Sequence, residues 1–330
     1  MCEVVWCNYT RQRWARSTDP SVLLNCARQF NQTGATLTQH YLDIQPADLM
    51  RYIDWLNEWQ PGNFVTLHIA GRRAGHLKAA TRDALAQWPD YFSIGEERVD
   101  MTVGAEDFGQ RSRVLEEVAR ALVEQQVIPN YLDEPYGVTG HGHEDVLALL
   151  DRGAAGYFGI RTYGQHINGF VRHAGRIRMW IGRRAPDRFH FPDRLDNFVA
   201  GGLPHNQTLH QNLLKECHEE AGVPAALAAT ARPVGAVSYC RETAIGLKPD
   251  ALYCYDLELP PDFQPQNTDG EVAEFKLIDL QQVLEIARDS DQFKTNCVPV
   301  IIDFAYRHGL FDPERPGYLE LQQGLRQKSW

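Results

Sequence analysis

The sequence lacks any apolar run approaching the length of a membrane span, and it has no pair of cysteines at CxxC spacing. Its seven cysteines are odd in number and scattered, which indicates free thiols in a reducing, cytoplasmic compartment. Basic residues are also fewer than acidic ones, 33 against 43. The formal net charge is −10, whereas nucleic acids and anionic membranes require a basic surface. We therefore expect neither a nucleic-acid partner nor a membrane partner.

The densest chemistry in the chain lies at residues 201–223, which read GGLPHNQTLHQNLLKECHEEAGV. Apolar residues recur in it at spacings of three and four, and Gly222 followed by Pro224 is typical of a helix stop. The pattern predicts a helix over residues 208–221. Its last turns carry three carboxylates, on Glu216, Glu219 and Glu220.

These three carboxylates predict a metal site. At the end of a helix they repel one another and the negative end of the helix dipole, unless a cation lies among them. Oxygen-only ligands of full charge suit a hard cation, so we expect Mg²⁺, with Mn²⁺ as the alternative ion. Solvated carboxylates are the alternative interpretation, because such residues are common near helix ends.

The whole stretch resembles the signature of the Nudix hydrolases, G-x5-E-x7-R-E-U-x-E-E-x-G-U, where U is apolar. Gly201 matches its opening glycine, and residues 216–223 match its end without a gap. Two positions depart from it: Gln207 replaces a glutamate and Lys215 replaces an arginine. In the family these two residues look like a structural ion pair that fixes the loop on the helix. A Gln–Lys pair can keep a hydrogen bond but loses the charge-assisted, bidentate geometry of that pair. The resemblance implies metal ligation by Glu216, Glu219 and Glu220, with Glu216 and Glu219 in catalysis.

Flanking segments narrow the resemblance to the thiamine-pyrophosphokinase-related Nudix branch, in which a small domain precedes the Nudix domain. The matching segments are residues 195–202, 235–239, 255–260 and 269–272. The resemblance implies an α+β fold class, a Nudix α/β/α sandwich with a mixed sheet preceded by a small α+β domain. The expected boundaries are an N-terminal extension over 1–47, the small domain over 48–153, the Nudix domain over 154–310 and a surface tail over 311–330.

The N-terminal half shows no pattern typical of catalysis, and the resemblance assigns its small domain to substrate selection or dimer contacts. Periodicity and turn residues predict a series of short elements there. They are a helix over 47–60, a hairpin of strands 64–69 and 75–78, a helix near 81–88, a strand pair within 91–103 and a helix over 111–126. The first thirty residues carry four arginines against only two acidic residues, a composition close to that of an organellar transit peptide. An N-terminal extension over 1–47, or a start codon placed too early, is the preferred interpretation.

The segment Gly140 to Asp145 reads GHGHED and invites a metal interpretation, since imidazoles and carboxylates are metal ligands. Acidic residues that open a helix over 145–150 explain the same letters, and this interpretation is preferred.

Candidate substrate-binding residues precede the signature, on strands expected at 166–173 and 176–182 after a first strand at 157–160. His166 and Asn168 alternate onto one strand face, so both could meet a ligand, and a hydrogen-bonded structural pair explains them equally well. Arg183 and Arg184 at a strand end suit a phosphate, with solvated charge as the alternative.

A further carboxylate is expected after the signature, where a turn at residues 269–271 precedes a strand over 273–278. Nudix enzymes often take a metal ligand or a general base from this point. Glu271 is the candidate and Glu274 the alternative. Strands over 233–239 and 251–257 precede this turn, and helices over 280–287 and 295–308 follow it.

The implied chemistry is metal-dependent hydrolysis of an organic diphosphate to a monophosphate plus phosphate. The branch implies thiamine diphosphate, or its damaged oxo and oxy relatives, as the substrate. A Nudix pyrophosphatase for another nucleoside or sugar diphosphate, and a ligand-binding module that has lost catalysis, stay open. The sequence is silent on oligomeric state, and the superfamily implies a homodimer.

Overall fold

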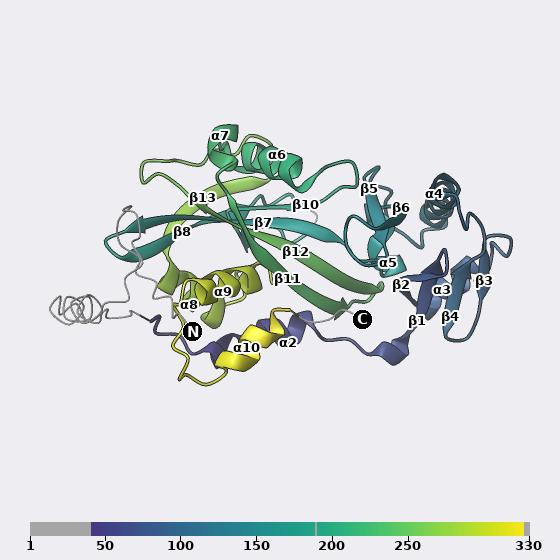
Figure 1. Cartoon of the computed structure of the whole chain (residues 1–330), viewed down its shortest axis with the longest axis horizontal. Coiled ribbons are helices and arrows are strands. Elements are labelled where there is room, and N and C mark those ends of the chain that lie inside the picture. The colour runs from purple at the N-terminus through teal and green to yellow at the C-terminus, as the bar shows by residue number, and fades with distance from the viewer. Residues whose placement is uncertain (1–40, 189, 327–330) are drawn as a thin grey trace, which may run out of the picture. The chain divides into compact units, whose positions relative to one another are not determined.

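The structure is a computed structural model that describes residues 41–188 and 190–326, all within one compact unit (Figure 1). Most of the expected N-terminal extension, including Cys2, Cys7 and Cys26, lies outside the described residues. The four cysteines of the described part, Cys217, Cys240, Cys254 and Cys297, are free and buried, as expected. No helix in this part is long and apolar enough to cross a membrane.

The first domain is a small α+β unit, as expected. A hairpin of β1 (Phe64–Ile69) and β2 (Arg72–Lys78) begins its four-stranded sheet, whose order is β2-β1-β4-β3. Strand β4 runs parallel to β1, and the other pairs are antiparallel. The remaining elements are β3 (Phe92–Ile94), β4 (Arg98–Met101), α3 (Ala79–Leu85), α4 (Phe108–Glu124), β5 (Pro135–Thr139), β6 (Val146–Asp151), η3 (Arg152–Ala154) and α5 (Ala155–Phe158).

Two predictions for this half were wrong. Residues 146–151 form strand β6, which pairs with β5, and not a helix opened by Asp145. Residues 155–158 form helix α5 and not a first strand. Both segments are short apolar runs, whose periodicity does not separate strand from helix. The GHGHED segment is therefore the turn of a hairpin, where Asp145 binds Arg72 at 2.8 Å.

The second domain is an α/β/α sandwich, which confirms the expected fold class. Its mixed sheet has the order β11-β12-β7-β8-β13, with β12 parallel to β7, and β10 and β9 pair with β7 and β8. Helices α6 and α7 lie over one face, and α8 and α9 over the other (Figure 1). The bounds are β7 (Tyr163–His173), β8 (Arg176–Arg184), β9 (Leu195–Asp196), β10 (Val199–Gly202), α6 (Leu209–Ala221), α7 (Ala225–Ala228), β11 (Arg232–Glu242), β12 (Leu247–Glu258), β13 (Val272–Asp279), α8 (Leu280–Asp289) and α9 (Cys297–Arg307).

The two ends of the described chain pack together on the second domain, which corrects two expected boundaries. The short helices η1 (Pro46–Leu49) and α2 (Met50–Leu56) were assigned to the first domain, and residues 311–330 to a surface tail. Instead, α2 packs beside α10 (Tyr318–Gly324). Their buried residues share one core with α8 and α9, among them Ile44, Leu49, Ile53, Phe311, Leu321 and Leu325. Each segment is too short to bury an apolar face alone, so the two cover one another. The short η2 (Pro61–Asn63) leads from α2 to β1.

Candidate active site

Helix α6 positions the three predicted carboxylates. The Thr208 hydroxyl accepts the Gln211 backbone N–H at 3.2 Å, while the Gln211 amide oxygen accepts the Thr208 N–H at 3.0 Å. This capping box starts the helix, and Gly222 ends it with a left-handed φ of 62°. One edge of α6 packs on the sheet through Leu213, Cys217 and Ala221. The predicted helix and its stop are confirmed.

Glu216 and Glu220 project from α6 toward β10. A methyl group added at Gly201 would overlap the Glu216 carboxyl group, which explains the glycine at this motif position. Glu220 is 7% exposed, and its carboxylate accepts the Ala200 N–H at 2.9 Å. Burial raises the pKa of both carboxyls, that of Glu220 to about 8. The Glu271 carboxylate adds to both rises, so these three acids form one electrostatic cluster.

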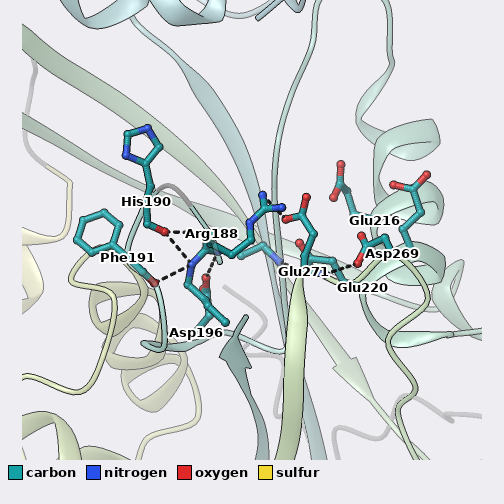
Figure 2. Close-up of polar contacts among 12 residues, drawn as sticks. Arg188, His190, Phe191, Asp196, Glu216, Glu220, Asp269 and Glu271 are labelled. Carbon is teal, nitrogen blue, oxygen red and sulfur yellow. Dashed lines mark hydrogen bonds and ion pairs between the residues drawn. The ribbon is translucent and has the colours of Figure 1, made fainter. Parts of the chain in front are cut away.

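The loop after β12 brings Glu271 to this cluster. Gln266 N donates to Ala221 O at 3.0 Å, and Thr268 N to Glu219 O at 2.9 Å, so the loop caps carbonyls at the end of α6. The Asp269 carboxylate accepts the Glu271 N–H at 2.8 Å. Figure 2 shows Glu271 turned toward Arg188, which it meets at 2.7 Å, with Glu216 and Glu220 nearby.

Glu274 has a different environment from Glu271. Its carboxylate pairs with Arg183 at 2.8 Å and with Lys276 at 3.0 Å. Hydrogen bonds from these two cations lower the pKa of Glu274. Of the two candidates for the further carboxylate, Glu271 is therefore the one coupled to the carboxylates of α6.

The donor set fits a hard divalent cation. Glu216, Glu219, Glu220 and Glu271 supply four carboxyl groups. Two cations form ion pairs with them: Lys215 with Glu216 and Glu219, and Arg188 with Glu271. Carboxylate oxygens are the ligands that such a cation prefers. The three carboxylates of α6 do not close around one point. In the described part of the chain, only His166, Asp196 and Cys297 bring three potential ligand atoms within 4.8 Å of one another.

The predicted hydrogen bond between Gln207 and Lys215 is not formed. The amide oxygen of Gln207 is buried without a hydrogen-bond partner. The Lys215 ammonium lies instead between Glu216, at 3.1 Å, and Glu219, at 2.9 Å. A lysine amine is attracted more strongly by two carboxylates than by one neutral amide, which accounts for the difference.

We expect Lys215→Met to raise the affinity for Mn²⁺. Lys215 neutralises two carboxylates that the cation would use, so its removal takes away a competing charge. Because the Lys215 side chain is 41% exposed, solvent screens this effect, and we expect a gain of roughly threefold. Calorimetric titration with Mn²⁺ measures it. Lys215→Arg keeps the charge and should bind like the wild type, and unchanged affinity in Lys215→Met would contradict the competition.

The residues predicted to bind substrate are engaged within the protein. His166 and Asn168 are 3% and 0% exposed and lie on the sheet face away from α6, since the alternating Gln165 and Ile167 face that helix. A His166 ring nitrogen lies 2.6 Å from the Asn197 amide oxygen, and Asn168 donates to Asp256 at 3.1 Å. The alternative interpretation, a hydrogen bond between His166 and Asn168, is not observed: each binds a different residue. Packing on both faces of the central strand β7 is the reason, and the sequence does not reveal it.

Both candidate arginines are also paired. Arg183 binds Glu274 and Asp193, and Arg184 binds Asp196 at 3.1 Å and the carbonyls of His190 and Phe191. Solvated charge was the alternative for these residues. The structure shows ion pairs within the sheet edge instead.

The buried group of His166, Asp196 and Cys297 was missed by sequence reasoning, because its members are distant in the chain. Lys294 and Arg184 bind the Asp196 carboxylate at 2.9 and 3.1 Å, and the Cys297 thiol donates to it at 2.6 Å. Burial raises the pKa of Cys297, so the thiol stays protonated. Two cations already outweigh the single carboxylate, which does not suit a further cation. We interpret this group as a structural polar network.

Comparisons with known proteins match both domains. The family described as "Domain of unknown function (DUF4743)" matches residues 48–162, and the NUDIX domain family matches residues 166–297. "Nudix hydrolase 20, chloroplastic" of Arabidopsis thaliana is 41% identical over 300 residues, 87% of this chain and 80% of that protein. "Nudix hydrolase 24, chloroplastic" of the same plant is 39% identical over 313 residues, 93% of this chain and 86% of that protein. Among solved structures, the NUDIX domain of Shewanella oneidensis NrtR complexed with ADP ribose has a TM-score of 0.37 and 16% identity, over 46% of this chain and 90% of that chain.

Proposed function

Because this chain belongs to the Nudix hydrolase family, we propose that it hydrolyses an organic diphosphate with the help of a divalent cation, Mg²⁺ being the expected ion. The proposed substrate is thiamine diphosphate or one of its oxo and oxy relatives. The carboxylate cluster of Glu216, Glu220 and Glu271 is the observation that supports this function most. The thiamine assignment rests on the flanking segments that resemble the thiamine-pyrophosphokinase-related branch.

In the proposed reaction, water attacks the terminal phosphorus, and the bond from this phosphorus to the bridging oxygen breaks. The products are the organic monophosphate and orthophosphate. Glu216, Glu219 and Glu220 would hold the cation. When bound, such a cation lowers the pKa of a water molecule and offsets the negative charge of the phosphate oxygens. Glu271 would accept the proton of the attacking water, and Arg188, 2.7 Å from its carboxylate, would orient it.

A substrate panel tests this function. We expect release of phosphate from thiamine diphosphate and its oxo and oxy analogues with Mg²⁺, and none when the metal is chelated. ADP-ribose and nucleoside diphosphates complete the panel. Hydrolysis of ADP-ribose or nucleoside diphosphates, without hydrolysis of any thiamine compound, would support the hydrolase activity and overturn the thiamine assignment. Metal-dependent binding without any turnover would identify a ligand-binding module instead.

Oligomeric state and location stay predictions. Gel filtration with light scattering would test the expected homodimer. The cytoplasmic location was expected from the free thiols, whereas both Arabidopsis relatives carry the word "chloroplastic" in their names.

A further inference from the structure

The first domain reaches the candidate active site through the hairpin of β5 and β6. Tyr136 on β5 is 4% exposed, and a methyl group added at Gly202 would overlap its hydroxyl group. The neighbouring Pro135 carbonyl accepts the His205 N–H at 3.0 Å. Gly202 follows Gly201, over which the Glu216 carboxylate lies. Tyr136 therefore lies directly beside the start of the motif, although it belongs to another domain.

The Tyr136 hydroxyl has no hydrogen-bond partner among the residues that the structure describes. Its oxygen is not among the buried side-chain atoms that lack a partner in the described part of the chain, so it reaches the surface, where it can bond to water or to a ligand. Burial raises the pKa of Tyr136, and the Glu216 carboxylate adds to this rise. The hydroxyl thus stays protonated at neutral pH and is available as a donor beside Gly202, next to the motif glycine over which Glu216 lies.

Arg152 follows β6 and lies beside Tyr136. Its guanidinium carbon is 5.9 Å from the centre of the Tyr136 ring, and its Nη1 donates to Glu134 at 2.8 Å. In the described part of the chain, its Nε and Nη2 groups bind no acceptor, and the side chain is 46% exposed. Burial lowers the pKa of Arg152, yet Tyr136, Glu134 and Glu271 together raise it above the ordinary value.

The two domains contribute complementary groups that could bind a diphosphate with its cation. The second domain contributes Glu216, Glu219, Glu220 and Glu271, which attract a cation and repel a phosphate. The hairpin of the first domain contributes an unpaired hydroxyl and a cation with free donors, which suit phosphate oxygens. A diphosphate that meets a carboxylate-bound cation on one side needs donors of this kind on the other.

We propose that the Tyr136 hydroxyl and the Arg152 guanidinium bind a phosphate group of the diphosphate substrate, so that the active site is built by both domains. The inference rests on the proposed function and adds to it a role for the first domain. That domain contacts the loop of the motif through the hydrogen bond from His205 N–H to the Pro135 carbonyl, and it adds phosphate donors to the carboxylates of the second domain. Tyr136 and Arg152 are substrate-binding residues in this proposal.

The test measures binding of methylene diphosphonate, which is not hydrolysed, to the full chain in the presence of Mg²⁺ by calorimetry. We expect Tyr136→Phe and Arg152→Gln each to weaken binding by roughly tenfold or more, because each removes a hydrogen bond to a charged acceptor. The KM for the diphosphate substrate should rise in parallel. Arg152→Lys, which keeps the charge without the planar fork, should lie between Arg152→Gln and the wild type.

Two variants serve as controls. Tyr131→Phe removes a hydroxyl from the same domain, where the ring packs under Arg120, and should bind as the wild type does. Glu134→Gln removes the ion-pair partner of Arg152 and should bind no more weakly than the wild type.

Binding in Tyr136→Phe and Arg152→Gln equal to that of the wild type would overturn the proposal and leave both residues with a packing role. If Tyr136→Phe unfolds, Arg152→Gln decides alone, because this half-exposed residue is not part of the core. A wild type that binds no diphosphonate would also overturn the proposal. Diphosphonate binding that depends on both residues, without hydrolysis of any diphosphate, would support the phosphate site and overturn the proposed catalysis.

Discussion

Glu219→Gln and Glu220→Gln are each expected to lower the rate of diphosphate hydrolysis by roughly a thousandfold, the effect of several kcal/mol of lost charge stabilisation. Each substitution replaces a carboxyl group, which can ligate a cation with a negative oxygen, by a neutral amide of the same size. At position 220 the amide oxygen can still accept the Ala200 N–H, so the fold should persist. Initial rates at saturating Mg²⁺ measure hydrolysis, titration with Mn²⁺ measures metal affinity, and circular dichroism checks that the fold persists.

Glu274→Gln is the matched control for these variants. It removes a carboxylate on β13 that is paired with Arg183 and Lys276, and its rate should stay within a few-fold of the wild type. Glu271→Gln should behave like the α6 variants. Normal activity in Glu219→Gln or Glu220→Gln, or a large loss in Glu274→Gln with activity kept in Glu271→Gln, would contradict the assignment of the site.

Asp256→Asn should produce the largest loss of stability among the substitutions considered. The Asp256 carboxylate is 2% exposed and accepts hydrogen bonds from Arg307 at 3.0 Å and from Asn168 at 3.1 Å, with His308 also at 3.1 Å. Breaking a buried ion pair by removal of one partner costs about 3 kcal/mol or more. For a chain of this size we expect the melting temperature to fall by roughly 5–10 °C.

The same carboxylate predicts how stability depends on pH. Burial alone would raise the pKa of Asp256, but hydrogen bonds from His308 and Arg307 outweigh it and hold the pKa at about 2, against 3.8 for an unperturbed aspartate. A group with a lower pKa in the folded state stabilises the fold above its unfolded pKa. This contribution of about 2 kcal/mol should fade as the pH falls from about 4 toward 2.

Urea unfolding of the wild type and of Asp256→Asn between pH 7 and pH 3 measures both effects. The difference between the two proteins should shrink at the acid end, because protonation neutralises the carboxylate in the wild type. Asp262→Asn, at an exposed position shortly after the same strand, is the control and should change stability little. A difference that is independent of pH would show that the charge of Asp256 is not what stabilises the fold.

The sequence alone predicted the elements whose signals are local. Helix α6 followed from its apolar period and its glycine stop, both within one stretch of chain. The same stretch placed Glu216, Glu219 and Glu220 on the helix, and its resemblance to the Nudix signature gave the family and the sandwich fold. Most strands of the second domain were found for the same reason, since alternation and turn residues act over a few neighbouring positions.

Only the tertiary structure decided how polar side chains were shared between elements. In the folded chain Lys215 pairs with Glu216 and Glu219 and not with Gln207. Arg183 and Arg184 form ion pairs at the edge of the sheet. Helices cover His166 and Asn168, so both are buried. The tertiary structure selected Glu271 over Glu274 through a loop that caps the end of α6. It also placed Tyr136 of the first domain against Gly202 of the motif. Such outcomes depend on contacts between distant segments, whose geometry no local pattern contains.

The domain boundaries show the same division. Residues 41–56 and 311–326 looked like parts of separate regions, because each is a short segment with an ordinary amphipathic pattern. They form one layer only because each buries the other's apolar residues on α8 and α9. The sequence by itself determined helix α6, the carboxylates that it carries, and the family. The tertiary structure decided which groups surround that helix, because burial and pairing are properties of the packed chain and not of any one segment.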